Sequence, residues 1–131
     1  MGRGDADLRA SRPAAARAWL ARIELPQPEV GRSRIGSTVL YVDRFGNVQL
    51  NVRREQLEEA GVVPGTKVEL ELAGERYYAV AARTFADARP GDLILYEDSY
   101  RNVAVAISRG NAAELLHAQP GQDLRIDVGV P

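Results

Sequence analysis

Hydrophobic and polar residues alternate along several short stretches of the chain, which is the pattern of a β-strand with one buried face. The alternation is clearest where Val68, Leu70 and Leu72 are separated by two glutamates. Similar alternation, or a run of β-branched and aromatic residues, predicts further strands at Thr38–Val42, Val48–Val52, Tyr77–Arg83, Asp92–Asp98, Asn102–Ser108 and Leu124–Val128. The first two of these, and likewise residues 92–98 and 102–108, are close enough in sequence to form hairpins.

Turn residues separate the predicted strands. Gly46–Asn47 offers the positive φ that a tight hairpin needs. Elsewhere a proline fixes φ at the first corner of a turn and a glycine takes positive φ at the second, just before the strands that follow Pro64–Gly65, Pro90–Gly91 and Pro120–Gly121. Short strands separated by such turns are typical of a barrel or sandwich. We expect a mainly β fold, a small closed antiparallel β-barrel with two short helices.

The two helices of this barrel are expected at Arg53–Ala60, which Gly61 would end in the left-handed conformation, and at Asn111–His117. The second begins with an asparagine suited to the N-cap position, and Glu114 three residues later completes a variant of the capping box.

Residues 1–34 are expected to be an N-terminal tail and linker. Ser11 is placed to cap a helix over Arg12–Ala21, and Pro26–Gln27–Pro28 then favours an extended chain. Residues 35–131 would form the barrel domain.

Composition narrows the possible functions. The 131 residues suit one domain, and with no cysteine and a single histidine, His117, we expect no disulfide and no metal site. The net charge of −1 and the 6% aromatic content argue against a nucleic-acid-binding barrel. No apolar run approaches the roughly 20 residues of a membrane span, and no secretory signal is present. We therefore expect a cytoplasmic protein without membrane contact.

Polar side chains gather at the first predicted hairpin, where Asp43 and Asn47 stand at the tip and Asn51 follows. Two interpretations stay open. The carboxylate and carboxamides can satisfy the backbone of the turn. Alternatively, the Asn47 carboxamide offers a donor and an acceptor that match the edge of adenine.

A second group follows at Asp98–Ser99–Tyr100 and at Arg109–Ala113. Asn111 serves as a helix cap on either interpretation, and the N–H groups of Ala112 and Ala113 are candidates to donate to a ring nitrogen. Phe85 lies in a loop-like stretch between strands. It is a candidate lid for the barrel end or a stacking platform for a base.

Together, in this order, these groups resemble the signatures of the S-adenosylmethionine hydroxide adenosyltransferases, which are adenosine-forming hydrolases related to the fluorinases and chlorinases. The segment from Val39 to Asn51 is similar to the family's strand followed by DxFGNxxxN. The family's second signature is similar to Tyr96–Tyr100, Ala104–Ala106 and Gly110–Ala113. The resemblance covers roughly residues 23–128.

The resemblance implies that this chain is a C-terminal barrel that supplies an adenosine pocket. The resemblance also implies a larger N-terminal α/β domain that would carry the catalytic groups, and we expect it to be absent from this chain, whose segment at Pro26 is similar to the family's interdomain linker. Family members are trimers whose sites lie between the N-terminal domain of one subunit and the C-terminal domain of its neighbour. The implied partners are S-adenosylmethionine or adenosine and that catalytic domain. We expect no cofactor apart from the substrate, and no catalytic residue in this chain.

The resemblance also implies a role for individual residues. Asp43 would hold the methionine ammonium or a nearby polar group, Asn47 would bind adenine and Phe85 would stack on it. Ser99 would lie near the methionine carboxylate, and the helix start at Asn111 and Ala112 would read the adenine edge. Tyr100 stands where the fluorinases have an arginine, and a tyrosine does not form the bidentate carboxylate clamp of that arginine. This difference argues against halogenase activity.

The implied reaction is displacement of methionine by water at the 5′ carbon of the ribose, which gives adenosine and methionine. The alternative is a stand-alone barrel that serves as an interaction module and has lost ligand binding.

Overall fold

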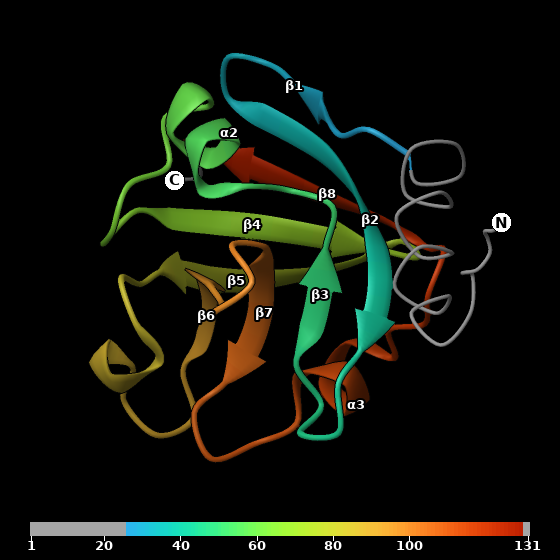
Figure 1. Cartoon of the computed structure of the whole chain (residues 1–131), viewed down its shortest axis with the longest axis vertical. Helices are drawn as coiled ribbons and strands as arrows, with labels where there is room; N and C mark the ends of the chain where they lie inside the picture. The colour runs from blue at the N-terminus through green and yellow to red at the C-terminus, as the bar shows by residue number, and fades with distance from the viewer. Residues whose placement is uncertain (1–25, 130–131) are drawn as a thin grey trace, which may run out of the picture.

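The computed structural model describes residues 26–129, so the helix expected over Arg12–Ala21 lies outside the described residues. The chain forms an eight-stranded sheet in the order β1-β2-β3-β7-β6-β5-β4-β8, and β8 returns to pair with β2. This last pairing closes seven strands into a barrel and leaves β1 outside the ring (Figure 1). The predicted closed barrel with two short α-helices is confirmed.

The elements follow the sequence pattern, with ends shifted by a few residues. The strands are β1 (Glu29–Val30), β2 (Arg34–Val42), β3 (Val48–Leu50), β4 (Lys67–Leu72), β5 (Glu75–Ala81), β6 (Leu93–Glu97), β7 (Val103–Ile107) and β8 (Asp123–Val128). The helices are α2 (Arg54–Glu59), α3 (Ala112–Leu116) and the single-turn 3-10 helix η2 (Phe85–Asp87).

One strand pair departs from the expected antiparallel arrangement. β5 and β6 are parallel, with Val80 opposite Ile94 and Ala81 opposite Leu95. A parallel pair needs a crossover rather than a tight turn. The crossover spans residues 82–92 and contains η2, which places Phe85 outside the barrel wall.

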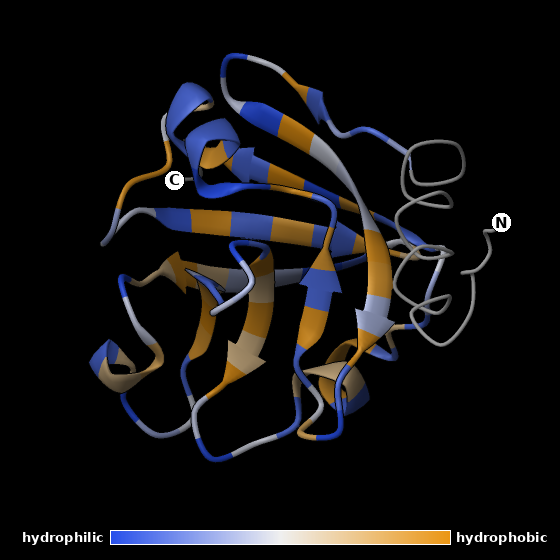
Figure 2. Ribbon diagram, in the orientation of Figure 1, coloured by the Kyte–Doolittle hydropathy of each residue, from blue (hydrophilic) through white to orange (hydrophobic). Residues whose placement is uncertain are grey.

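Alternate residues of the strands fill the barrel. Val68, Leu70 and Leu72 are at most 1% exposed, whereas the glutamates between them are only partly buried. The alternation is visible along β4 as bands of opposite hydropathy (Figure 2). Ile35 and Ile126, which are cross-strand partners at the β2–β8 closure, are fully buried. The pairing that closes the barrel is therefore supported by core packing.

The predicted turns are confirmed with one exception. The glycines of the three Pro–Gly pairs have φ values of +96°, +88° and +91°, in the order Gly65, Gly91 and Gly121. Gly61 follows α2 with φ +94°, as its predicted role requires. Of the Gly46–Asn47 pair, only Gly46 takes positive φ.

The extended segment before the barrel is attached to it. Asn51 Nδ2 donates to the carbonyl of Pro26 at 2.9 Å, and Asn51 Oδ1 accepts from the Thr38 N–H at 2.8 Å. Residues 29 and 30 then pair with β2 as β1. Asn51, which the sequence groups with the candidate site, therefore contributes to the fold.

Ion pairs join the outer faces of β2, β8 and β4. Asp127 accepts hydrogen bonds from Arg34 Nε at 2.7 Å and Arg125 Nε at 2.9 Å, and Arg125 also binds Glu71. Burial acts to raise the pKa of Asp127, but the hydrogen bonds and charges of the two arginines outweigh it and hold this pKa below its usual value.

We expect the network around Asp127 to make the thermal stability of the protein fall as the pH is lowered. A carboxyl whose pKa is lowered by folding stabilises the protein above its unfolded pKa of about 4, and that contribution is lost as the pH falls through the folded pKa. Asp127→Asn should therefore reduce the difference in thermal midpoint between pH 7 and pH 3. Asp123→Asn, on the same strand but exposed, is the control. Equal midpoint differences in the two variants would contradict this assignment.

Candidate functional site

The β2–β3 hairpin tip is held by the side chain of Asp43. Its Oδ1 accepts from the N–H groups of Phe45 at 2.9 Å and Asn47 at 3.0 Å, and its carbonyl accepts from the Gly46 N–H at 3.0 Å. Its Oδ2 accepts from Asn47 Nδ2 at 3.1 Å. Asp43 therefore organises the turn, as the first interpretation of this hairpin expects, and also fixes the orientation of the Asn47 carboxamide.

The β6–β7 hairpin repeats the same backbone arrangement. Asp98 Oδ1 accepts from the N–H groups of Tyr100 at 2.9 Å and Asn102 at 3.0 Å, and the Asp98 carbonyl accepts from the Arg101 N–H at 3.0 Å. Arg101 occupies the place of Gly46 and has φ +70°. A non-glycine residue in the left-handed region is strained, and such residues concentrate at functional sites.

Between the two tips, one row of cross-strand neighbours crosses four strands. Tyr41 of β2 lies opposite Gln49 of β3, Gln49 opposite Ala104 of β7, and Ala104 opposite Tyr96 of β6. Because β3 and β7 are antiparallel, the tips before them stand at opposite ends of these strands. The row thus forms the middle of a surface that the two tips bound.

Two adjoining hollows open over this row and together form what we call the cleft. They share four residues: Phe45, Asn47, Phe85 and Tyr96. The first, which we call the aromatic half, has a volume of about 540 Å³ and adds Ile107, Arg109 and Gly110. The second, the acidic half, has about 440 Å³ and adds Tyr41, Asp43, Gln49, Arg83, Thr84, Glu97, Asp98, Ser99 and Tyr100.

The aromatic half presents rings and one carboxamide. Phe85 meets Tyr96 edge to face, with ring centroids 5.8 Å apart and planes at 62°. Phe85 is 42% exposed and Phe45 is 63% exposed, so ring surface is left free to cover a flat ligand. Asn47 lines both halves together with these rings and so marks the junction with the acidic half.

The acidic half is shaped electrostatically by its carboxylates. Burial raises the pKa of Tyr41, and the charges of Asp98 and then Asp43 raise it further. Burial and the same two aspartates also raise the pKa of Tyr96. Both phenols therefore stay protonated near neutral pH and can donate hydrogen bonds, in a field that favours a cationic ligand group.

The structure brings most of the expected site residues together. Asp43, Asn47, Phe85, Ser99 and Tyr100 all line the cleft. Tyr41, Gln49 and Tyr96 lie within the two signature segments but were not predicted as site residues, because only the pairing of four strands brings them side by side. A polar Gln49 amid the β3 valine and leucine was the available signal.

Asn111 and Ala112 occupy a different place. Asn111 caps α3 by accepting from the Glu114 N–H at 2.9 Å, and Ala112 is fully buried. The N–H of Ala113, also considered for a ligand, donates to the Gly46 carbonyl at 2.8 Å. In this structure the start of α3 supports the hairpin that carries Asn47, whereas Arg109 and Gly110 just before it line the cleft.

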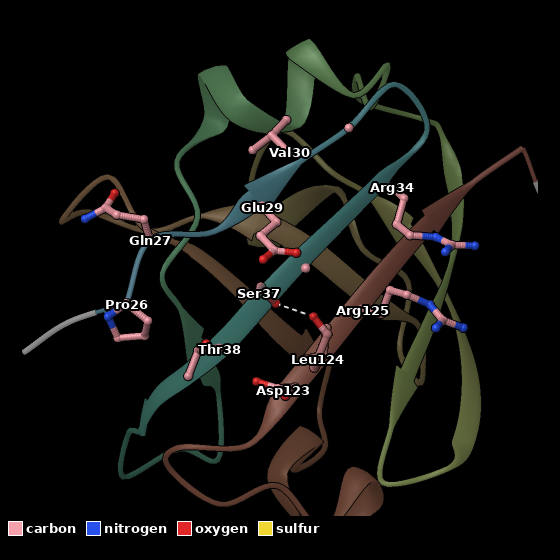
Figure 3. A pocket seen from close by; sticks show the side chains of 12 residues that line it. Pro26, Gln27, Glu29, Val30, Arg34, Ser37, Thr38, Asp123, Leu124 and Arg125 are labelled. Carbon is pink, nitrogen blue, oxygen red and sulfur yellow. Dashed lines mark hydrogen bonds between the residues drawn. The ribbon is translucent and has the colours of Figure 1, made fainter.

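A larger hollow of about 750 Å³ lies elsewhere, along β1, β2 and β8 (Figure 3). Its arginines, Arg34 and Arg125, are already paired with Asp127, and the Ser37 hydroxyl donates to the Leu124 carbonyl. These three side chains are thus committed to the fold, and we regard the cleft as the candidate site despite its smaller halves.

Residues 26–129 contain no group of three side chains suited to hold a metal ion. Within the same residues, no helix is long and apolar enough to cross a membrane.

Residues 37–125 match the model of the SAM hydroxide adenosyltransferase C-terminal domain, where SAM is S-adenosylmethionine. An (R)-S-adenosyl-L-methionine hydrolase of Salinispora tropica is 41% identical over 109 residues, which are 82% of this chain and 39% of that protein. A fluorinase of Nocardia brasiliensis is 32% identical over 114 residues, 84% of this chain and 38% of the relative. The chain thus spans about two-fifths of the length of these relatives.

Among solved structures, an uncharacterised conserved protein from Thermotoga maritima superposes with a TM-score of 0.75 and 25% identity. The match covers 80% of this chain and 40% of the Thermotoga protein. The fold therefore recurs as part of a longer chain.

Proposed function

Because the chain belongs to the SAM hydroxide adenosyltransferase family, whose C-terminal domain it carries, we propose that its cleft binds S-adenosylmethionine by the adenosine end. One observation carries the proposal: the Asn47 carboxamide is fixed by Asp43 at the junction of the two halves, and the exposed rings of Phe45 and Phe85 line both halves with it. A flat base with a donor and an acceptor on its edge fits this combination.

In the proposed pose, adenine occupies the aromatic half. With one N–H of Asn47 committed to Asp43, its Oδ1 and second N–H remain for the donor and acceptor of the adenine edge. Phe85 stacks against the base. The methionine part extends into the acidic half, where Ser99, Tyr100 and Arg83 are placed to meet its carboxylate.

The proposed reaction is hydrolysis at the ribose 5′ carbon. The oxygen of water forms a bond to that carbon as the carbon–sulfur bond breaks, its electron pair passes to the sulfonium sulfur, and methionine leaves as a neutral thioether. The attacking water also loses a proton. His117, at the end of α3, does not line the cleft, and we assign this chain binding and orientation of the substrate.

We assign the groups that activate water to a separate N-terminal catalytic domain of the same family, which would close over the exposed rim of the cleft, as in a homotrimer. The name of the Salinispora relative specifies the (R) form of the substrate. We propose the same sulfonium configuration as the substrate here.

The second candidate function is an interaction module without a ligand. The observation in its favour is the exposure of aromatic side chains at the rim, since Tyr100 is 78% and Phe45 63% exposed. A protein surface covering this rim would bury them equally well.

Adenosine binding separates the two candidates. We expect adenosine and S-adenosylmethionine to bind the chain in calorimetry and Asn47→Ala to weaken both by about tenfold or more, since it removes a paired contact to the base. Asn102→Ala is the matched control, because Asn102 holds the equivalent place in the other hairpin and does not line the cleft. Asn102→Ala should bind adenosine and S-adenosylmethionine with the affinity of the wild type.

Two other outcomes would change the proposal. If Asn47→Ala binds adenosine as tightly as the wild type, the assignment of adenine to the aromatic half is wrong. If adenosine binds neither the chain alone nor the chain with a family N-terminal domain added in trans, the interaction module is favoured instead.

A further inference from the structure

Gln49 is a polar residue in a place where the fold alone calls for an apolar one. It sits at the centre of the row Tyr41–Gln49–Ala104–Tyr96 and is 3% exposed, between the fully buried Val48 and Leu50. Its carbonyl oxygen Oε1 is buried and has no hydrogen-bond partner. Leaving such an acceptor unpaired destabilises the folded protein, and an unpaired buried group in a native structure calls for an explanation.

The unpaired oxygen lies where a ligand would reach it. Gln49 lines the acidic half of the cleft, together with Asp43 and Asp98. An isolated acceptor of this kind needs a donor, and the donor has to come from outside the described protein groups.

The surroundings select the charge of that donor. Glu97 Oε2 is likewise buried without a hydrogen-bond partner, and the carboxylate forms only ion pairs, with Arg54 at 3.5 Å and Arg101 at 3.8 Å. Asp43 and Asp98 already raise the pKa of the tyrosines at both ends of the row. A hydrogen-bond donor that also carries positive charge is therefore preferred over a neutral hydroxyl.

We infer that Gln49 is a specificity-determining residue of this site, whose Oε1 accepts a hydrogen bond from the ammonium group of the substrate's methionine part. The inference rests on the proposed function. With adenine in the aromatic half, the ammonium is the cationic donor that enters the acidic half, and the sulfonium has no hydrogen to donate. Gln49 thus distinguishes the whole substrate from nucleosides that lack the amino acid.

The inference predicts opposite effects on stability and on binding. Gln49→Met keeps the length of the side chain but removes the acceptor, so the ligand-free chain should melt at the same temperature or higher. The variant should bind S-adenosylmethionine about tenfold more weakly, because a hydrogen bond to a charged donor is lost. Affinity for 5′-methylthioadenosine, which has the sulfur but no amino acid, should not change.

Two further variants complete the experiment. Gln49→Glu keeps an acceptor and should retain the preference for S-adenosylmethionine over 5′-methylthioadenosine. Gln27→Met makes the same replacement in the separate hollow of Figure 3 and should leave both affinities unchanged.

The possible results separate this inference from the proposed function. If Gln49→Met weakens both ligands equally, or neither, the ammonium assignment is overturned while the adenosine pocket stands. The same holds if the wild-type chain binds 5′-methylthioadenosine as tightly as S-adenosylmethionine. If neither ligand binds the wild type, the proposed function fails in its own test and this inference falls with it.

Discussion

Gly46→Ala is expected to lower the free energy of unfolding by about 2 to 3 kcal/mol and to disrupt adenosine binding. Gly46 has φ +84°, which costs an alanine energy by itself. A Cβ there would also lie 2.6 Å from Asn111 Nδ2, and closer still to Oδ1 and Cγ of the same side chain. Asn111 can yield only by giving up its cap on α3.

Gly46→Ala should weaken adenosine binding because Gly46 joins α3 to the hairpin that carries Asn47. The Gly46 carbonyl accepts from the Ala113 N–H at 2.8 Å, and displacement of the hairpin from α3 would stretch this bond. Asn47, one residue later, would move with it. The start of α3 thus holds the hairpin that carries Asn47.

Gly91→Ala is the matched control for this prediction. Gly91 has φ +88°, but nothing lies within 4 Å of a Cβ built there. Its substitution should cost about 1 to 2 kcal/mol from the backbone alone and leave adenosine affinity unchanged. Denaturant unfolding and calorimetry on the two variants measure both effects. Equal losses of stability would show that the contact with Asn111 contributes nothing.

Local signals were sufficient to predict most elements of the barrel. The alternation at Val68–Leu72 is confirmed as β4, and the glycine of each Pro–Gly pair takes the expected φ. These features depend on neighbours within a few residues. The parallel β5–β6 pair does not, because it joins Val80 to Ile94 and depends on how the whole ring closes. The residue types in the two strands do not indicate whether the strands pair in parallel or antiparallel.

The same division applies to the candidate site. Asp43 and Asn47 were singled out because the turn concentrates polar residues within five positions. Gln49 and Tyr96 were not, since they are 47 residues apart in sequence and become neighbours in one row only through β7. The sequence therefore predicted the ends of the cleft, and long-range pairing determines its floor.

Asp43→Ala is expected to weaken adenosine binding by about tenfold and to destabilise the chain by about 2 to 3 kcal/mol. The carboxylate accepts three hydrogen bonds, two from backbone N–H groups of Phe45 and Asn47 and one from Asn47 Nδ2. Each contributes about 1 kcal/mol to stability. Binding weakens because the Asn47 carboxamide loses the contact that fixes its orientation before the base arrives.

Asp98→Ala provides the comparison within the same molecule. Asp98 accepts the two equivalent backbone bonds in the β6–β7 hairpin, from Tyr100 and Asn102, and lies in the acidic half. Its loss should destabilise the chain by about 2 kcal/mol with little effect on adenosine, which lacks the amino acid. If the two alanine variants weaken adenosine binding equally, Asp43 acts through hairpin stability alone.

Asp43→Asn separates the two roles of this residue more sharply. The oxygen of the new carboxamide can still accept from the N–H groups of Phe45 and Asn47, so the turn should be largely retained. Its amide nitrogen would then face Asn47 Nδ2, and two donors repel, so Asn47 has to rotate away from its present orientation. We expect near wild-type unfolding with adenosine affinity still reduced at least tenfold. Retained affinity would mean that adenine recognition does not need the Asp43–Asn47 contact, and that the hairpin backbone alone places the carboxamide.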